Sequence, residues 1–261
     1  MSDTRNKFII KIDATKRLFL WHVLSKKLHL ILVSEYPKSG GTWLSKLLAD
    51  YFEIDFPRNK IPRLQKSVMH GHFLYSENFY NPVILLRDGR DVMVSAYYHF
   101  LFFNERNSHN HVTKIRNLLN FDNYDDIKTN LPKFIEYMFC SYSKGIFKFS
   151  WSQFINSWID KDVTVVKYES LLQDTRKALE KVLLSRSELK INYEKLEEIV
   201  YKNSFSQQSK KFINSQSHNF LRKGISGDWK NHFSKEACQV FNKFGGDELI
   251  KSGYEKNRNW F

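Results

Sequence analysis

The sequence predicts a single α/β domain in which helices cover both faces of a central parallel sheet. Two observations lead to this prediction. Short apolar segments alternate with amphipathic segments, and the first transition between them passes through a glycine turn. No repeat, low-complexity tract or Pro/Gly-rich linker divides the 261 residues. We therefore expect one domain over residues 1–261, with residues 1–27 as a basic amphipathic extension.

The first strand and helix are predicted at the start of this domain. Leu28 to Ser34 is apolar apart from His29, which is typical of a strand buried on both faces. After a turn, apolar residues recur at helical spacing, at Leu44, Leu47, Leu48, Tyr51 and Phe52. Pro82 to Leu86 then predicts a second strand, and Val92 to Phe103 a second helix.

The remaining elements continue the alternation. Val163 to Lys167 predicts a third strand. Ser170 and Gln173 have the spacing of a capping box and predict the start of the next helix. Residues 104–130 and 204–227 are polar and weakly periodic. We expect them to form long loops at the carboxyl edge of the sheet, where parallel sheets bind ligands.

The composition narrows the function classes. A hydrophobic content of 42% excludes a disordered chain, and the net charge of +13 indicates an anionic partner or merely solvated basic faces. Cys140 and Cys238 lie too far apart in the sequence for a disulfide framework or a thiolate zinc site. Leu18 to Leu24 is too short for a signal peptide or a membrane span. We expect a cytoplasmic protein without stable membrane insertion, whose N-terminal helix packs on the domain or touches a membrane surface.

The segment Tyr36 to Trp43, YPKSGGTW, predicts an anion-binding loop between the first strand and helix. Its two adjacent glycines allow close approach of the backbone to a ligand, and the N-terminus of the helix directs N–H groups and partial positive charge at it. Side-chain donors come from Lys38, Ser39 and Thr42. The segment is not a Walker A loop, in which the lysine follows the glycines.

Two further segments combine cations with turn residues. Arg87 follows the second strand and Ser95 lies two helical turns later, so a guanidinium and a hydroxyl can bind one phosphate. The segment Phe220 to Lys230 carries two cations beside two glycines, which also suits a phosphate.

Together the three segments resemble the motifs of the cytosolic-type sulfotransferases that use 3'-phosphoadenylyl sulfate (PAPS). The family's phosphosulfate loop is similar to Y-P-K-S-G-T-T-W, from which this chain departs at Gly41. Its 3'-phosphate motif is matched at Arg87, Asp91, Ser95, Tyr97 and His99. Its late R-K-G-x-x-G-D-W-K-N-x-F loop is similar to residues 222–233. The resemblance extends from about Leu28 to Glu255 and implies a three-layer fold like that of P-loop NTPases.

The resemblance also implies roles for individual residues. The 5'-phosphosulfate would be held by Lys38, Ser39, Gly40, Gly41, Thr42 and Trp43. The 3'-phosphate would be held by Arg87, Ser95, Arg222, Lys223 and Gly224. Tyr168 resembles the family's tyrosine near the adenine, and Ser204-Phe205 its S-F loop. The implied donor is PAPS, the product is adenosine 3',5'-bisphosphate (PAP), and no metal is required.

The catalytic base is predicted among two histidines. The family has a histidine after the strand that precedes the 3'-phosphate strand, and this chain offers His70 and His72 there. Because residues i and i+2 of a strand face the same side, both imidazoles can reach the site. We favour His72, at the expected strand end, with His70 as the alternative. His99, His109 and His111 lack the spacing of metal ligands.

The predicted function is transfer of a sulfuryl group from PAPS to a hydroxyl of a small-molecule acceptor such as a secondary metabolite. Residues 104–130 and 134–151 are expected to form the acceptor pocket, and a homodimer is compatible with the sequence. A small-molecule kinase and a glycan or amine sulfotransferase remain alternatives. The absence of a Walker A loop argues against the kinase. An RNA-binding module would depend on Gly224-x-x-Gly227, a weak match, so no nucleic acid partner is expected.

Overall fold

The computed structural model describes residues 7–58, 60–103, 109–141, 148–186, 190–204 and 224–261. The chain forms two compact units. One, the helical unit, consists of residues 1–2, 87–161 and 217–261. The other, the sheet unit, consists of residues 3–86 and 162–216. The expectation of a single domain stays a prediction.

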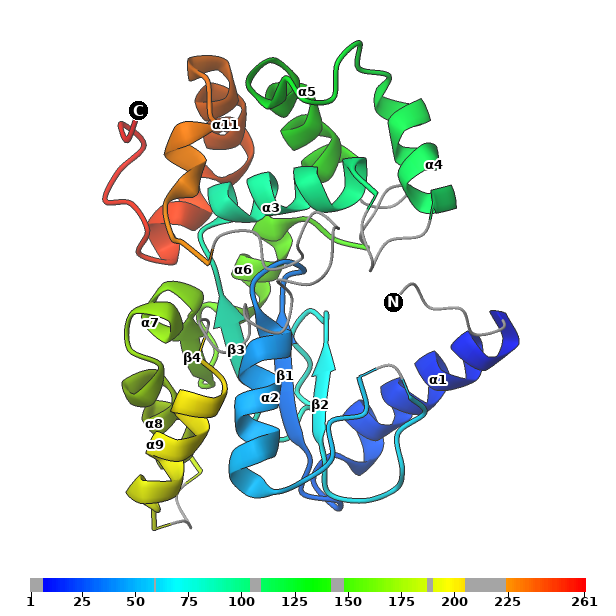
Figure 1. The fold of residues 1–261 in the computed structure, drawn as a ribbon, viewed down its shortest axis with the longest axis vertical. Helices are drawn as coiled ribbons and strands as arrows, with labels where there is room; N and C mark the ends of the chain where they lie inside the picture. Colours follow the sequence, from blue (N-terminus) through cyan, green and yellow to red (C-terminus); the bar gives the residue numbers. More distant parts are fainter. Residues whose placement is uncertain (1–6, 59, 104–108, 142–147, 187–189, 205–223) are drawn as a thin grey trace. The chain divides into compact units, whose positions relative to one another are not determined.

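The sheet unit contains a four-stranded parallel sheet with the strand order β2-β1-β3-β4 (Figure 1). The strands are β1 (Ile31–Glu35), β2 (Val68–Gly71), β3 (Val83–Leu86) and β4 (Thr164–Lys167). Every residue of β1 and β3, the two central strands, is buried. The continuous apolar runs of the sequence arise for this reason, since a strand covered on both faces has no polar side. The predicted α/β class with a central parallel sheet is confirmed.

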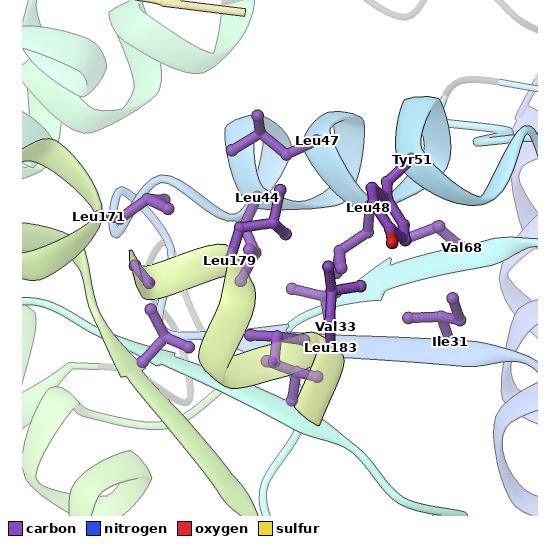
Figure 2. Close-up of a cluster of buried hydrophobic side chains, with 14 of the residues drawn as sticks. Ile31, Val33, Leu44, Leu47, Leu48, Tyr51, Val68, Leu171, Leu179 and Leu183 are labelled. Atoms are coloured by element: carbon purple, nitrogen blue, oxygen red, sulfur yellow. The ribbon is translucent and has the colours of Figure 1, made fainter. Parts of the chain in front are cut away.

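Helices accompany the sheet in the same unit. They are α1 (Lys7–Phe19), the π-helical turn η1 (Leu20–Leu24), α2 (Gly41–Phe52), α7 (Tyr168–Gln173), α8 (Thr175–Leu184) and α9 (Tyr193–Lys202). Figure 2 shows how the apolar faces of α2 and α8 meet over β1, with Leu44, Leu48, Leu179 and Leu183 around Val33. Each of these side chains is at most 1% exposed, and burial of such a side chain contributes roughly 1.5–3 kcal/mol. This core fixes the start of α2 at the end of β1.

The helical unit contains no strand among its described residues. It comprises α3 (Gly89–Leu101), α4 (His109–Leu119), α5 (Ile127–Cys140), α6 (Trp151–Trp158), the 3₁₀ helix η2 (Asp228–Asn231) and α11 (Lys235–Lys251). The rings of Phe139 and Trp151 lie 5.5 and 5.7 Å from Phe241 of α11. A Cβ at Gly89 would lie 2.7 Å from Trp151, so only glycine lets α3 begin against this cluster.

Two local predictions were wrong. Within the expected loop over residues 104–130, residues 109–119 and 127–130 are helical, and in α4 Val112, Ile115 and Leu119 bury an i, i+3, i+7 stripe between polar neighbours. Phe134 and Trp151, the bounds of the second expected acceptor-pocket region, are core residues, 0% and 1% exposed, and the pocket itself stays a prediction. Ser170 lies inside α7 and caps nothing.

The cap of α8 is Asp174, whose side chain accepts a hydrogen bond from Lys177 N at 2.9 Å. The helix begins there because the chain already turns into α7 directly after β4. Most of the predicted loop over residues 204–227 lies outside the described residues. Within the described part of the chain, every helix is too short or too polar to cross a membrane.

Candidate active site

The anion loop lies between the end of β1 and the start of α2, as predicted. Lys38 and Gly40 adopt positive φ angles of 76° and 98°, which turn the chain sharply into the helix. A Cβ at Gly40 would lie 2.7 Å from the Tyr168 ring, so glycine is needed for close packing as well as for the turn. The first amides of α2 have no partners within the helix. The loop therefore presents the positive end of a helix dipole, although Gly41 N already donates to Glu35 and Trp43 N to the Gly40 carbonyl.

The buried hydroxyl of Ser39 is compatible with a ligand at this loop. Its side chain is 1% exposed, and its Oγ has no hydrogen-bond partner among the described residues. A buried hydroxyl without a partner is costly, roughly 1–3 kcal/mol, so such groups are usually satisfied by a ligand or water. An anion held at the N-terminus of α2 would satisfy this hydroxyl.

Glu35, the last residue of β1, joins the loop to the histidine pair. Its Oε2 accepts a hydrogen bond from Gly41 N, and its Oε1 lies 3.0 Å from His70 Nε2. These hydrogen bonds and the charge of His70 lower the pKa of Glu35, although burial, the largest single effect, opposes them. Glu35 is not among the residues predicted for the site. The available signal was a carboxylate at the end of a strand that is otherwise apolar.

His72 contacts the backbone of the same residue. Its Nδ1 lies 3.1 Å from the Glu35 carbonyl oxygen. Because a carbonyl can only accept, Nδ1 carries the hydrogen and Nε2 keeps its lone pair. The His70 and His72 rings are 5.0 Å apart, which confirms that both face the same side of the strand.

The electrostatic surroundings keep His72 neutral. Burial lowers its pKa to about 4, and the nearby charges of His70 and Arg58 act in the same direction, whereas Glu35 opposes them. Although the atoms packed around the ring lower its pKa, His72 keeps solvent-accessible surface, which leaves it open to a ligand. A neutral imidazole with a defined tautomer can accept a proton at Nε2.

Glu35, His70 and His72 also have the composition of a metal site. One ligand atom from each lies within 4.8 Å of the other two. In the structure both carboxylate oxygens are instead engaged, one by Gly41 N and the other by His70. The arrangement therefore serves as a hydrogen-bonded link between the loop and the histidines.

Trp43, Tyr168 and Ser204 all lie in the sheet unit, and their role at the nucleotide stays a prediction. Trp43 Nε1 donates to the Asn203 carbonyl at 3.0 Å, and the Trp43 and Tyr168 rings are 6.3 Å apart. Asn203 is anchored in turn by its Nδ2, which donates to Asp50 at 2.9 Å. Ser204, the next residue, is thereby held near α2.

In the helical unit the second and third motifs meet through Asp91. Its carboxylate accepts hydrogen bonds from Gly227 N at 2.7 Å and from Trp229 N at 2.9 Å. Burial raises the pKa of Asp91, while the positive charge of Arg87 opposes that rise. The late loop is therefore held against the start of α3, the helix that carries Ser95. Gly224 has a φ of 59°, a left-handed conformation suited to glycine.

Arg90, the second arginine of this segment, has a structural role. Its Nη2 lies 2.7 Å from Asp88, its Nη1 lies 2.5 Å from Glu255, and its guanidinium covers the ring of Trp229 at 4.0 Å. Arg87 follows β3 directly and is partly exposed, and its charge acts on the Asp91 carboxylate. Three predicted site residues, Phe205, Arg222 and Lys223, lie outside the described residues.

Comparison with known proteins decides the family. Residues 58–253 match the family model of the sulfotransferase domain. The chain belongs to the sulfotransferase family. The match begins after the anion loop, so the loop is assigned by its own sequence and geometry.

Curated relatives can be aligned with most of the length of this sulfotransferase. Human sulfotransferase 1E1 is 27% identical over 85% of this chain and 84% of its own length. The 3-beta-hydroxysteroid sulfotransferase of guinea pig is 21% identical over 97% of this chain and 89% of its own. The crystal structure of mouse sulfotransferase SULT7A1 with PAP has a TM-score of 0.58 at 19% identity, covering 86% of both chains. That structure supports the fold.

The departure of this sulfotransferase from the family loop has a structural reason. A Cβ at Gly41 would lie 2.6 Å from both the Glu35 carboxyl carbon and His70 Nε2. The threonine that the family loop has at this position therefore cannot coexist with Glu35 in its present place. Glycine at 41 and glutamate at 35 form a matched pair.

We expect Gly41→Thr to lower the free energy of unfolding by roughly 1–3 kcal/mol, the usual cost of overpacking. Glu35→Ala should also destabilise the protein, since it leaves Gly41 N and His70 without their partner. The double variant should be less destabilised than the sum of the two, by at least about 0.5 kcal/mol. Urea unfolding of the four proteins measures this coupling, and additive effects would contradict the matched pair.

Proposed function

We propose that this sulfotransferase transfers the sulfuryl group of PAPS to a hydroxyl of a small-molecule acceptor, with His72 as the general base. The observation that carries the proposal is the pairing of a buried anion loop with a neutral histidine of defined tautomer, joined through Glu35. One part recognises the donor, and the other removes the proton of the acceptor. The mouse relative bound to PAP supports the nucleotide.

The loop has the features that the phosphosulfate end of the donor requires. The unpartnered Oγ of Ser39, the amides at the start of α2 and the side chains of Lys38, Thr42 and Trp43 would hold that end. Bound there, the nucleotide supplies an activated sulfuryl group. As sulfuryl transfer proceeds, negative charge grows on the leaving oxygen, and the Lys38 ammonium and the helix N-terminus stabilise it.

His72 would accept the acceptor's hydroxyl proton at Nε2. Its Nδ1–H remains bonded to the Glu35 carbonyl, which holds the ring in one orientation. The nearby Glu35 carboxylate stabilises the imidazolium as it forms, since its charge raises the pKa of His72 against the effect of burial. His70 would orient this group through Glu35 without itself taking the proton.

The rest of the donor would be recognised by the residues that the family resemblance assigns. Arg87, Ser95 and the loop around Gly224 would bind the 3'-phosphate, together with Arg222 and Lys223. Tyr168 and Ser204-Phe205 would line the nucleotide. A hydroxyl acceptor is favoured by relatives such as the guinea pig hydroxysteroid enzyme. A cytoplasmic location, which two free cysteines support, belongs to the same proposal.

A sulfuryl-transfer assay with a panel of acceptors tests the proposal. The protein is incubated with PAPS carrying labelled sulfur and a panel of phenols, alcohols, amines and sugars, and labelled products are separated. We expect a labelled sulfate ester with at least one alcohol or phenol. Transfer only to amines would contradict the hydroxyl acceptor, and phosphoryl transfer from ATP with magnesium would support the kinase alternative.

We expect Arg87→Ala to weaken binding of adenosine 3',5'-bisphosphate by roughly 10- to 100-fold, because a charged hydrogen bond contributes ~1.5–3 kcal/mol. Binding of adenosine 5'-phosphate, which lacks the 3' group, should hardly change. Calorimetry with both nucleotides measures the difference. Lys114→Ala removes an exposed cation of the same unit and serves as the matched control. Equal losses for both nucleotides would contradict the 3'-phosphate assignment.

A further inference from the structure

The N-terminal helix carries an apolar stripe that the sheet unit does not cover. Phe8, Ile12 and Phe19 are 69%, 42% and 49% exposed and share one side of α1 at helical spacing. The opposite side of the helix holds Asp13, 5% exposed. Figure 1 shows α1 sloping away from β2. Large side chains exposed together on one helix face indicate a binding surface.

A second segment beside α1 has the same character. Arg17 of α1 donates to the carbonyl oxygens of Pro57, Arg58 and Lys60, with the Lys60 contact at 2.8 Å. The segment that Arg17 holds there continues into Ile61 and Leu64, which are 42% and 61% exposed. We call this the α1 surface; its exposed apolar residues are Phe8, Ile9, Ile12, Leu18, Phe19, Val23, Ile61 and Leu64, and α1 also exposes Ile10 on its other side.

The charge around the α1 surface is mainly positive. Residues 7–34 and 56–76 contain ten lysines and arginines and a single acidic residue, Asp13, while Asp55 and Glu77 lie directly beside the second range. The Asp13 carboxylate is buried and lies 2.8 Å from Arg17, so it contributes no exposed negative charge. Lys11, Lys26 and Lys27 are exposed. A partner must therefore combine an apolar interior with a negative surface.

We propose that the α1 surface binds the surface of a lipid bilayer that contains anionic lipids, with α1 lying in the plane of the interface. An amphipathic helix with apolar residues on one face and lysines flanking it binds in this way. Another copy of this chain would bring like charges together at the same surface, so charge complementarity favours the lipid. This inference does not depend on the donor, the acceptor or the histidine base of the proposed function.

Vesicle sedimentation with the full chain tests the proposal. We expect the protein to bind phosphatidylcholine vesicles that contain phosphatidylserine on the order of tenfold more tightly than vesicles of phosphatidylcholine alone. The preference should weaken as salt is added, because added ions screen the lysines. No binding to either vesicle, or equal binding to both at low salt, would overturn it.

A matched pair of double variants assigns the binding to this surface. Phe8→Ala with Phe19→Ala should reduce vesicle binding by about tenfold or more, since each phenyl group is lost from the bilayer. Leu184→Ala with Tyr201→Ala removes two side chains that are 61% and 70% exposed on the same unit and should leave binding unchanged. Circular dichroism melts check that both variants stay folded. If both double variants lose vesicle binding to the same extent, the assignment of binding to the α1 surface is wrong.

Sedimentation velocity separates the lipid from a second copy of the chain. We expect the protein's oligomeric state to be the same with and without the Phe8 and Phe19 substitutions. A dimer that these substitutions dissociate, together with a lack of vesicle binding, would overturn the proposal in favour of a self-association surface.

Discussion

His72→Ala should lower kcat by roughly 100- to 10,000-fold, the usual contribution of a positioned general base. Binding of PAP should be retained, because the substitution leaves the anion loop intact. The reason lies in the two hydrogen-bonding atoms of the ring. Nδ1 is held by the Glu35 carbonyl at 3.1 Å, so Nε2 is the atom that keeps a lone pair for the acceptor's proton. Single-turnover rates and PAP titrations on the same preparation measure the two effects.

His70→Ala is the matched control for this prediction. His70 lies 3.0 Å from the Glu35 carboxylate, and we expect its loss to cost much less through disturbed orientation alone. The opposite result, with His70→Ala inactive and His72→Ala nearly normal, would exchange the two roles. If neither substitution affects turnover, the acceptor is an amine or an acidic group that needs no base, and the hydroxyl acceptor is wrong.

The pH profile provides a second readout for the same base. A histidine must be neutral to accept a proton, so kcat/KM rises as pH increases through its pKa. Because burial lowers the pKa of His72 to about 4, we expect the acid limb well below the ordinary histidine range near 6.5. The limb should be absent in His72→Ala. If the kcat/KM profile instead shows an acid limb centred near pH 6.5 that persists in His72→Ala, that limb belongs to another group.

Lys38→Ala should lower kcat by about 100-fold or more while weakening PAP binding far less. The ammonium acts on charge that develops at the leaving oxygen, so its contribution appears in the transition state rather than in ground-state binding. Rapid-quench measurement of sulfuryl transfer, set beside PAP affinity, measures this split. An unchanged kcat would contradict the role.

Two further variants separate the charge of Lys38 from its backbone. Lys38 has a φ of 76°, a conformation that glycine adopts without strain. Lys38→Gly should therefore lose as much activity as Lys38→Ala while being the more stable of the two. Lys46→Ala, on the same α2 helix, removes a lysine away from the loop and should retain near-normal turnover. A large activity difference between the alanine and glycine variants would indicate that loop geometry, rather than the ammonium, is responsible.

Local spacing determined most of the fold prediction. Continuous apolar runs predicted three of the four strands, because a strand buried on both faces has no polar side. Apolar residues at helical spacing predicted α2, because only one face of that helix is buried. Prediction failed where two local signals competed. Polar neighbours hid the buried stripe of α4, and Asp174 rather than Ser170 caps α8 because the chain turns into α7 first.

The sequence by itself predicted the anion loop, the cations at Arg87 and Lys223, and a base at one of two histidines, since each prediction depends on residue type at close spacing. Only the tertiary structure brought Glu35 to Gly41 and His70. That meeting depends on the parallel register of β1 and β2, in which Val33 lies opposite His70, and no local pattern encodes the pairing of strands so far apart in the chain. The same register places the Glu35 carbonyl against His72 and thereby decides which of its nitrogens can accept a proton.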